Sequence, residues 1–183
     1  MYAGRPHNGR VTTPASFVYP DWPQYAARVR DAVKDLNAEQ LALRAGPDHG
    51  TIWQLAAHSA GTRVFWLCGI FGRPGADTTA WPSPLTDPGW EDDESHPRSG
   101  EELRGALDAT WALVAQALED WTIEDLSLTA ERKRADGTVA VHSRASVLNR
   151  MMSHDAFHGG EMSQLLGLHH LPPIDLWVKQ LAR

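Results

Sequence analysis

Apolar residues recur at helical spacing in four long segments of this 183-residue chain, and this periodicity restricts the fold more than any other feature. Two of the segments begin with a capping box, Thr51 with Gln54 and Ser99 with Glu102, and Ser143 offers an N-cap for the last one. We therefore expect helices over residues 21–37, 51–71, 99–120 and 143–168.

The remaining segments predict how these helices are joined. Residues 74–98 contain five prolines and several acidic residues, which indicates a long irregular crossover between the second and third helices. Asp136-Gly137 predicts the turn of a short β-hairpin before the fourth helix. Residues 1–20 are expected to form a loosely ordered arm, and a short closing helix is expected from Asp175. Together the patterns predict a single all-α domain over residues 1–183, a four-helix bundle.

Composition narrows the classes of function. A formal net charge of -6 without any Lys/Arg-rich run argues against nucleic acid as a partner. The longest strongly apolar run, Val64–Phe71, is too short to cross a membrane. Cys68 is the only cysteine, so no intrachain disulfide can form, and the first 20 residues lack the apolar region of a signal peptide. These observations predict a cytoplasmic protein.

Three histidines are the candidate functional residues. His154, His158 and Glu161 fall on one face of the last predicted helix, because residues three and four apart share a face. His58 lies on the apolar face of another helix, so three imidazoles are expected to point inward. Buried imidazoles need partners, and a shared divalent cation supplies one for all three. The alternative is a set of core histidines bonded to hydroxyls and backbone carbonyls.

The chain resembles the DinB/YfiT-like superfamily over most of its length, in helix order and in four stretches: Thr51–His58, Val64–Trp66, Asn149–Glu161 and Leu165–Pro172. This resemblance implies a four-helix bundle with up-down-down-up connectivity. It also implies a divalent metal ion, most often zinc or nickel, bound by His58, His154 and His158. Many members carry Gln at the position of Glu161. The resemblance therefore leaves open whether Glu161 contacts the metal, orients a water molecule or pairs with an arginine.

Three histidine ligands would leave a coordination position open for a small molecule. A metal ion there would deprotonate a bound thiol or lower the pKa of a bound water. The resemblance favours a metal-dependent enzyme acting on small molecules with a low-molecular-weight thiol, by transfer or isomerisation. Two alternatives are a metal-dependent hydrolase with Glu161 as its general base and a non-catalytic, stress-related protein that binds a metal or small molecule. A metal-free structural bundle is a third. A zincin-like peptidase is disfavoured, because Asp155 stands where that motif has Glu.

Other side chains are expected to serve packing. Gly159 and Gly160 in mid-helix predict a close contact with the backbone there. Cys68 is expected to be a small core residue. Trp81 and Trp90 either anchor the crossover or line the mouth of a pocket.

The remaining expectations concern three arginines and a stretch of small apolar residues. Arg63, Arg144 and Arg150 are expected to be solvated or ion-paired rather than to bind an acidic substrate. Small apolar residues between Ala106 and Leu118 make a homodimer the predicted assembly.

Overall fold

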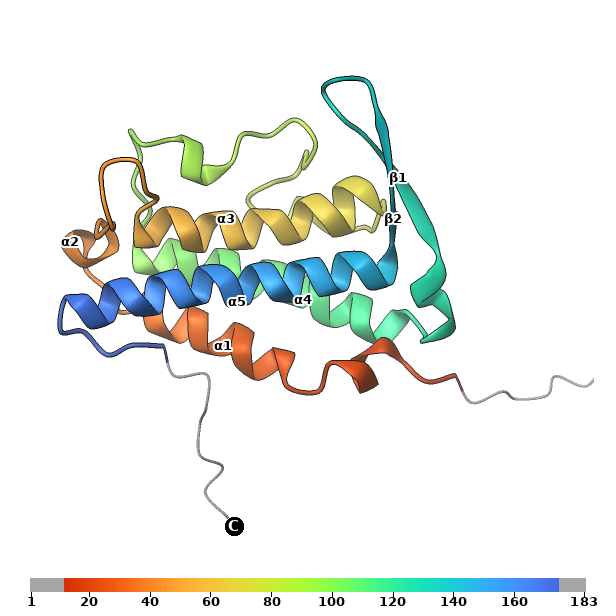
Figure 1. Ribbon diagram of the computed structural model, residues 1–183, viewed down its shortest axis with the longest axis horizontal. Coiled ribbons are helices and arrows are strands. Elements are labelled where there is room, and N and C mark those ends of the chain that lie inside the picture. Colours follow the sequence, from red (N-terminus) through yellow and green to blue (C-terminus); the bar gives the residue numbers. More distant parts are fainter. Residues whose placement is uncertain (1–11, 175–183) are drawn as a thin grey trace, which may run out of the picture.

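The computed structural model describes residues 12–174, and most of them are helical (Figure 1). Long helices lie side by side, and a two-stranded antiparallel sheet stands at one end. The helices are α1 (Trp22–Val33), α2 (Ala38–Leu41), α3 (Ile52–Val64), α4 (Gly100–Asp120) and α5 (Arg144–Leu168), and the strands are β1 (Thr129–Lys133) and β2 (Val139–Ser143). The mostly helical fold expected from the sequence is confirmed.

The predicted helix starts are confirmed as well. Thr51 caps α3 and Ser99 caps α4, each accepting the backbone N–H three residues further on, and both capping boxes are complete. Ser143 caps α5 through its hydroxyl oxygen. These starts were predictable because a cap and its partner are only three residues apart.

The first helix ends earlier than expected, and the second reaches its expected end but changes its geometry on the way. The first predicted helix was expected to reach Asn37, but α1 ends at Val33. The side chain of Asn37 instead accepts the N–H of Gln40 and begins the short helix α2. The helix α3 continues as a π-helix, η2 (Phe65–Ile70). It is followed by Gly72, whose φ of 64° is readily available to glycine.

The long helices share one core. The helix α3 packs against both α4 and α5, and α1 packs against α4, α3 and α5. Alanines on α3 allow close approach, and the start of α4 approaches the end of α1 closely. A Cβ on Gly100 would lie 2.5 Å from the carbonyl oxygen of Lys34. Fully buried core side chains include Val33, Ile52, Val64, Leu67, Leu103, Val114, Val147, Leu148 and Met162.

Part of the N-terminal arm is fixed to the helices. Pro14 forms an isolated antiparallel bridge with Thr122. The N–H of Ala15 donates to the carbonyl of Trp121 at 2.7 Å, and Ala15 is fully buried. Residues 12–20 are therefore more ordered than the sequence predicts, because the partner segment lies more than 100 residues away. Residues 1–11 and the closing helix predicted from Asp175 lie outside the described residues.

The two predicted connections are present. The hairpin pairs Thr129 with Ser143 and turns at Gly137, which has a φ of 83°. The crossover between η2 and α4 runs alongside α3 (Figure 1). It is anchored by Trp81, which is 3% exposed and packs on Gly61 of α3. A single turn of 3-10 helix in the crossover, η4 (Trp90–Asp92), also contacts α3.

The residues that were expected to serve packing differ in their surroundings. Gly159 packs against Val29 of α1, but a Cβ on Gly160 would meet no other atom within 4 Å. Cys68 is buried as expected, and burial raises the pKa of its thiol. The small residues from Ala106 to Leu118 that suggested a homodimer are largely buried against the other helices of the same chain. Within residues 12–174, none of the helices is long and apolar enough to span a bilayer.

Candidate metal centre

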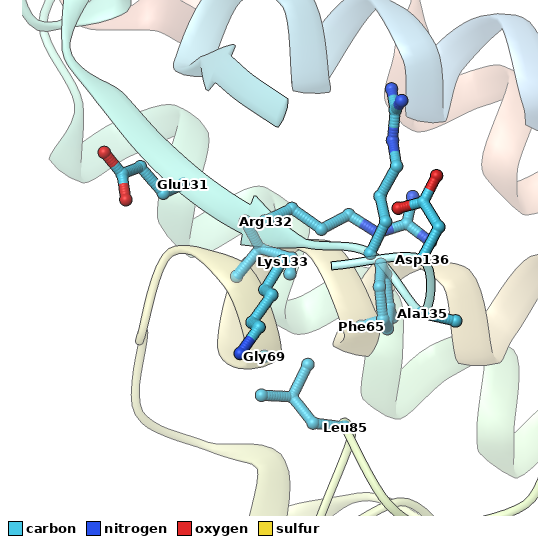
Figure 2. A pocket seen from close by; sticks show the side chains of 10 residues that line it. Phe65, Gly69, Leu85, Glu131, Arg132, Lys133, Ala135 and Asp136 are labelled. Atoms are coloured by element: carbon cyan, nitrogen blue, oxygen red, sulfur yellow. The ribbon is translucent and has the colours of Figure 1, made fainter. Parts of the chain in front are cut away.

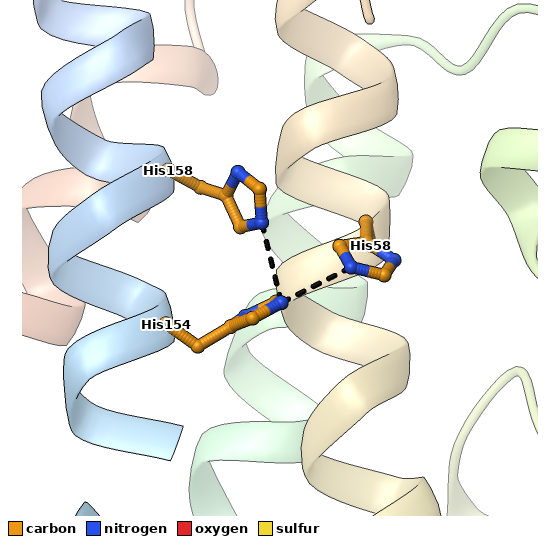
Figure 3. Close-up of side chains that lie close together, drawn as sticks. All are labelled: His58, His154 and His158. Atoms are coloured by element: carbon orange, nitrogen blue, oxygen red, sulfur yellow. Dashed lines mark hydrogen bonds between the residues drawn. The ribbon is translucent and has the colours of Figure 1, made fainter. Parts of the chain in front are cut away.

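His58 on α3 and His154 and His158 on α5 direct their rings toward one another between the two helices (Figure 3). The Nε2 atom of His154 lies 3.0 Å from Nε2 of His58 and 3.2 Å from Nε2 of His158. Ligand atoms of all three residues lie within 4.8 Å of one another. Imidazole nitrogens that bind one ion at about 2.0–2.1 Å are themselves about 3 Å apart. The spacing of the three rings therefore fits a single divalent cation.

Hydrogen bonding on the far side of the rings supports this interpretation. Nδ1 of His58 lies 2.6 Å from Oε1 of Glu91, and Nδ1 of His158 lies 2.6 Å from Oε2 of Glu161. A carboxylate can only accept, so each Nδ1 carries the hydrogen and each Nε2 presents a lone pair. If the Nε2 atom of His154 carries a hydrogen, it can donate it to the Nε2 lone pair of either His58 or His158, but not to both. At least one lone pair is left without a donor in the cluster, whereas a cation would satisfy all three.

The electrostatic surroundings differ between the rings. Burial lowers the pKa of His154 to about 4, and the neighbouring charges of His158, His58 and Arg63 act in the same direction. The hydrogen bond from Glu91 raises the pKa of His58. At neutral pH the imidazole of His154 is therefore uncharged, whereas His58 holds a proton more firmly than an ordinary histidine.

A buried ion pair sets the relative position of the two helices that carry the histidines. Arg63 on α3 is 1% exposed and donates to Asp155 on α5 at 2.9 Å. Asp155 also accepts the indole N–H of Trp22, and Arg63 reaches the backbone carbonyl of Leu107 on α4. Asp155 follows His154 directly in the chain, so this pair positions the histidine-bearing side of α5 against α3. The ion-paired state predicted for Arg63 is confirmed.

The crossover places Glu91 beside His58. Glu91 belongs to the single turn η4, whose backbone carbonyl accepts the side-chain N–H of Gln54 at 2.9 Å. Gln54 is also the N3 residue of the capping box of α3. Gln54 thus takes part in the cap at the start of α3 and, one helical turn before His58, holds the turn that carries Glu91.

A cavity of about 380 Å³ opens beside the histidines. His58 and His154 form part of its wall, and the crossover covers it with Trp81. Both interpretations of Trp81 are therefore compatible, since it anchors the crossover and lines the cavity. The other lining residues are Gly61, Thr62, Phe65, Trp66, Pro84, Asp87, Gly89, Glu91, Arg132 and Arg150.

The structure brings together all three histidines predicted as ligands. Glu161 lies next to them but contacts the far nitrogen of His158 and does not line the cavity. Sequence reasoning missed Glu91, whose only signal was the acidic character of the crossover. It also missed the pairing of Asp155 with Arg63, which joins positions 92 residues apart.

A helical protein with a three-histidine cluster between two of its helices is the class that this fold and site define. The sequence profile of the DinB superfamily matches residues 24–162, and the chain belongs to this superfamily. The resemblance predicted from the sequence is thus confirmed. A crystal structure of a DinB-like protein from Bacillus cereus ATCC 10987 is similar, with a TM-score of 0.65 and 18% identity over 91% of this chain and 100% of that chain. No protein with curated annotation matches this chain significantly.

Proposed function

We propose that this protein binds one divalent metal ion, zinc or nickel, through Nε2 of His58, His154 and His158. The observation that carries the proposal is the convergence of three Nε2 atoms, with more lone pairs than donors. Membership of the DinB superfamily, whose members often carry such a metal site, adds support.

The carboxylates beside the ligands have a positioning role in this proposal. Glu91 and Glu161 fix the ring orientation and the tautomer of His58 and His158. The open side of the centre faces the cavity beneath the crossover. A bound divalent ion would act as a Lewis acid there and favour the thiolate form of a thiol.

We further propose an enzyme that acts on small molecules, by thiol-dependent transfer or isomerisation with a low-molecular-weight thiol. The cavity of about 380 Å³ next to His58 and His154 supports a small substrate. Hydrolysis is the alternative, and it would need a free general base. The two carboxylates nearest the rings, Glu91 and Glu161, are both engaged with histidine nitrogens, which favours the first reaction class.

We also propose a connectivity for the helices and a cellular location for the protein. The chain direction in Figure 1 supports a four-helix bundle with up-down-down-up connectivity, since α3 and α4 run one way and α1 and α5 the other. The long crossover would then return the chain to the end at which α3 begins. A single buried cysteine is compatible with a cytoplasmic protein. A homodimer remains a prediction.

Metal analysis of the purified protein tests the central claim. We expect about one equivalent of zinc or nickel in the wild type, and its loss in His154→Ala and His158→Ala. His96→Ala is the matched control, because His96 is exposed on the crossover. In Glu91→Gln the metal affinity should fall about 10–100-fold. Wild-type protein that neither contains nor takes up metal would contradict the proposal.

Turnover is tested separately. Conjugation of glutathione or cysteine to an electrophile should require the metal and should disappear in His154→Ala. A protein with stoichiometric metal but no metal-dependent reaction with either thiol would instead support the non-catalytic alternative.

A further inference from the structure

Two arginines from different elements meet over one tryptophan at the wall of the cavity. The guanidinium of Arg132 on β1 lies 5.5 Å from the ring centroid of Trp66, and that of Arg150 on α5 lies 5.3 Å from it. Both arginines line the same cavity as His58 and His154. The cavity therefore has a basic wall within reach of the histidine cluster.

No carboxylate neutralises this wall within residues 12–174. Neither Arg132 nor Arg150 has an acidic oxygen within 4.0 Å, whereas Arg63 and Arg144 do. Two arginines without an acidic partner beside one buried ring are unexpected in a protein with a net charge of -6, because like charges repel. The prediction that Arg150 would be solvated or ion-paired is met only in that Arg150 is exposed.

The two acidic residues that line the cavity, Glu91 and Asp87, contact groups other than the arginines. Glu91 pairs with His58, and Asp87 accepts the backbone N–H of Ser83. The ring of His142 packs on Trp66 and also lies near these arginines. Its pKa is lowered by burial and then by the charges of the surrounding arginines, Arg150, Arg132 and Arg134.

The lining and the volume of the cavity indicate what kind of molecule could bind there. The aromatic rings of Phe65, Trp66 and Trp81 line it, and its volume of about 380 Å³ suits a compact molecule. Planar guanidinium groups match the geometry of a carboxylate. Arg132 also lines a neighbouring cavity of about 740 Å³ between the hairpin and η2, seen in Figure 2. Its lining adds Lys133 and Arg134, and also Glu131 and Asp136, so its charges are mixed.

We propose that the cavity binds a small carboxylate with a flat apolar body. Arg132 and Arg150 hold the carboxylate, the body lies among Phe65, Trp66 and Trp81, and the opposite end of the molecule reaches the histidine cluster. This inference names the substrate class of the proposed enzyme and rests on that function for its biological meaning. The binding itself depends on the arginines and not on the metal.

Calorimetric titration with benzoate, and with the neutral benzamide of nearly the same shape, tests the inference. We expect saturable binding of benzoate, and benzamide binding at least about tenfold weaker because it lacks the charge. Arg132→Gln and Arg150→Gln should each raise the dissociation constant for benzoate about tenfold. Arg104→Gln is the matched control, since Arg104 is an exposed arginine on α4 away from the cavity. Its dissociation constant should equal that of the wild type.

The titrations are run on protein loaded with zinc and on protein treated with a chelator. Arginine-dependent binding of benzoate in a protein that fails to bind zinc would support the inference and contradict the proposed metal centre. Stoichiometric zinc combined with equal binding of benzoate and benzamide would overturn the inference alone. Unchanged benzoate binding in both cavity variants, or no saturable binding at all, would also overturn it. Thermal unfolding of each variant verifies that it is folded.

Discussion

At the scale of single residues, burial decides how much an ion pair contributes to the free energy of unfolding. Arg63 and Asp155 are 1% and 7% exposed, and each is the main counter-charge of the other. Arg30 and Asp108 form a pair of the same 2.9 Å length on the surface, where water and salt screen it.

We predict that Asp155→Asn destabilises the protein by about 3–5 kcal/mol, because it leaves the Arg63 guanidinium buried without a counter-charge. Asp108→Asn removes the acid of the exposed pair and should cost less than about 1 kcal/mol. Urea unfolding of both variants measures the difference in the free energy of unfolding. Equal losses in the two variants would show that the buried pair has no special role.

At the scale of elements, the long helices are placed by a few close approaches of their backbones. Gly100 at the start of α4 lies against the last carbonyls of α1, so that a Cβ would come within 2.5 Å of Lys34 O and 2.8 Å of Val33 O. Gly105, five residues further along the same helix, faces open space. A side chain at position 100 would therefore clash with α1, whereas a side chain at position 105 would not.

Gly100→Ala should destabilise the protein by about 1–3 kcal/mol, because neighbouring backbone cannot move away as a flexible side chain can. Gly105→Ala should stabilise it by up to about 1 kcal/mol, since alanine lowers the entropy of the unfolded chain and favours helix. Thermal and chemical denaturation compare the two variants with the wild type. The opposite order would contradict the close approach of α1 and α4.

At the scale of the whole molecule, the histidine cluster joins two helices whose ligands are 96 residues apart in the chain. A cation bound there would close a long loop and would bind only the folded state. Metal binding would therefore be coupled to stability, and pH would enter through His58, whose pKa is raised by Glu91.

Zinc at about 100 times its dissociation constant should stabilise the protein by about 2.7 kcal/mol, which raises Tm by roughly 5–10 °C. The pKa of His58 is raised by Glu91, and zinc must displace that proton. The rise in Tm should therefore be complete well above the ordinary histidine pKa of about 6.5 and shrink as the pH falls through the raised value. Calorimetry with zinc and with a chelator measures it. His58→Ala should show no zinc-dependent rise at any pH, and a rise that persists in this variant would place the ion elsewhere.

Sequence alone determined the features that depend on neighbours within one helical turn. The caps at Thr51, Ser99 and Ser143 and the shared face of His154 and His158 follow from spacings of three or four residues. Helical periodicity indicated the number and order of the long helices for the same reason. His58 was identified because it lies on the apolar face of its predicted helix and because it matches the family motif.

Only the tertiary structure decided which distant residues meet. Glu91 reaches His58 because the crossover runs alongside α3, and nothing in its local sequence separates it from the other acidic residues there. Arg132 and Arg150 converge on Trp66 from a strand and a helix, and Ala106, Leu113 and Ala117 of α4 are buried against other helices of the same chain. Helix propensity and capping act within a few residues, whereas the packing of one helix on another depends on the side chains of both. The histidine cluster could therefore be predicted, and the groups that orient its rings and shape its cavity could not.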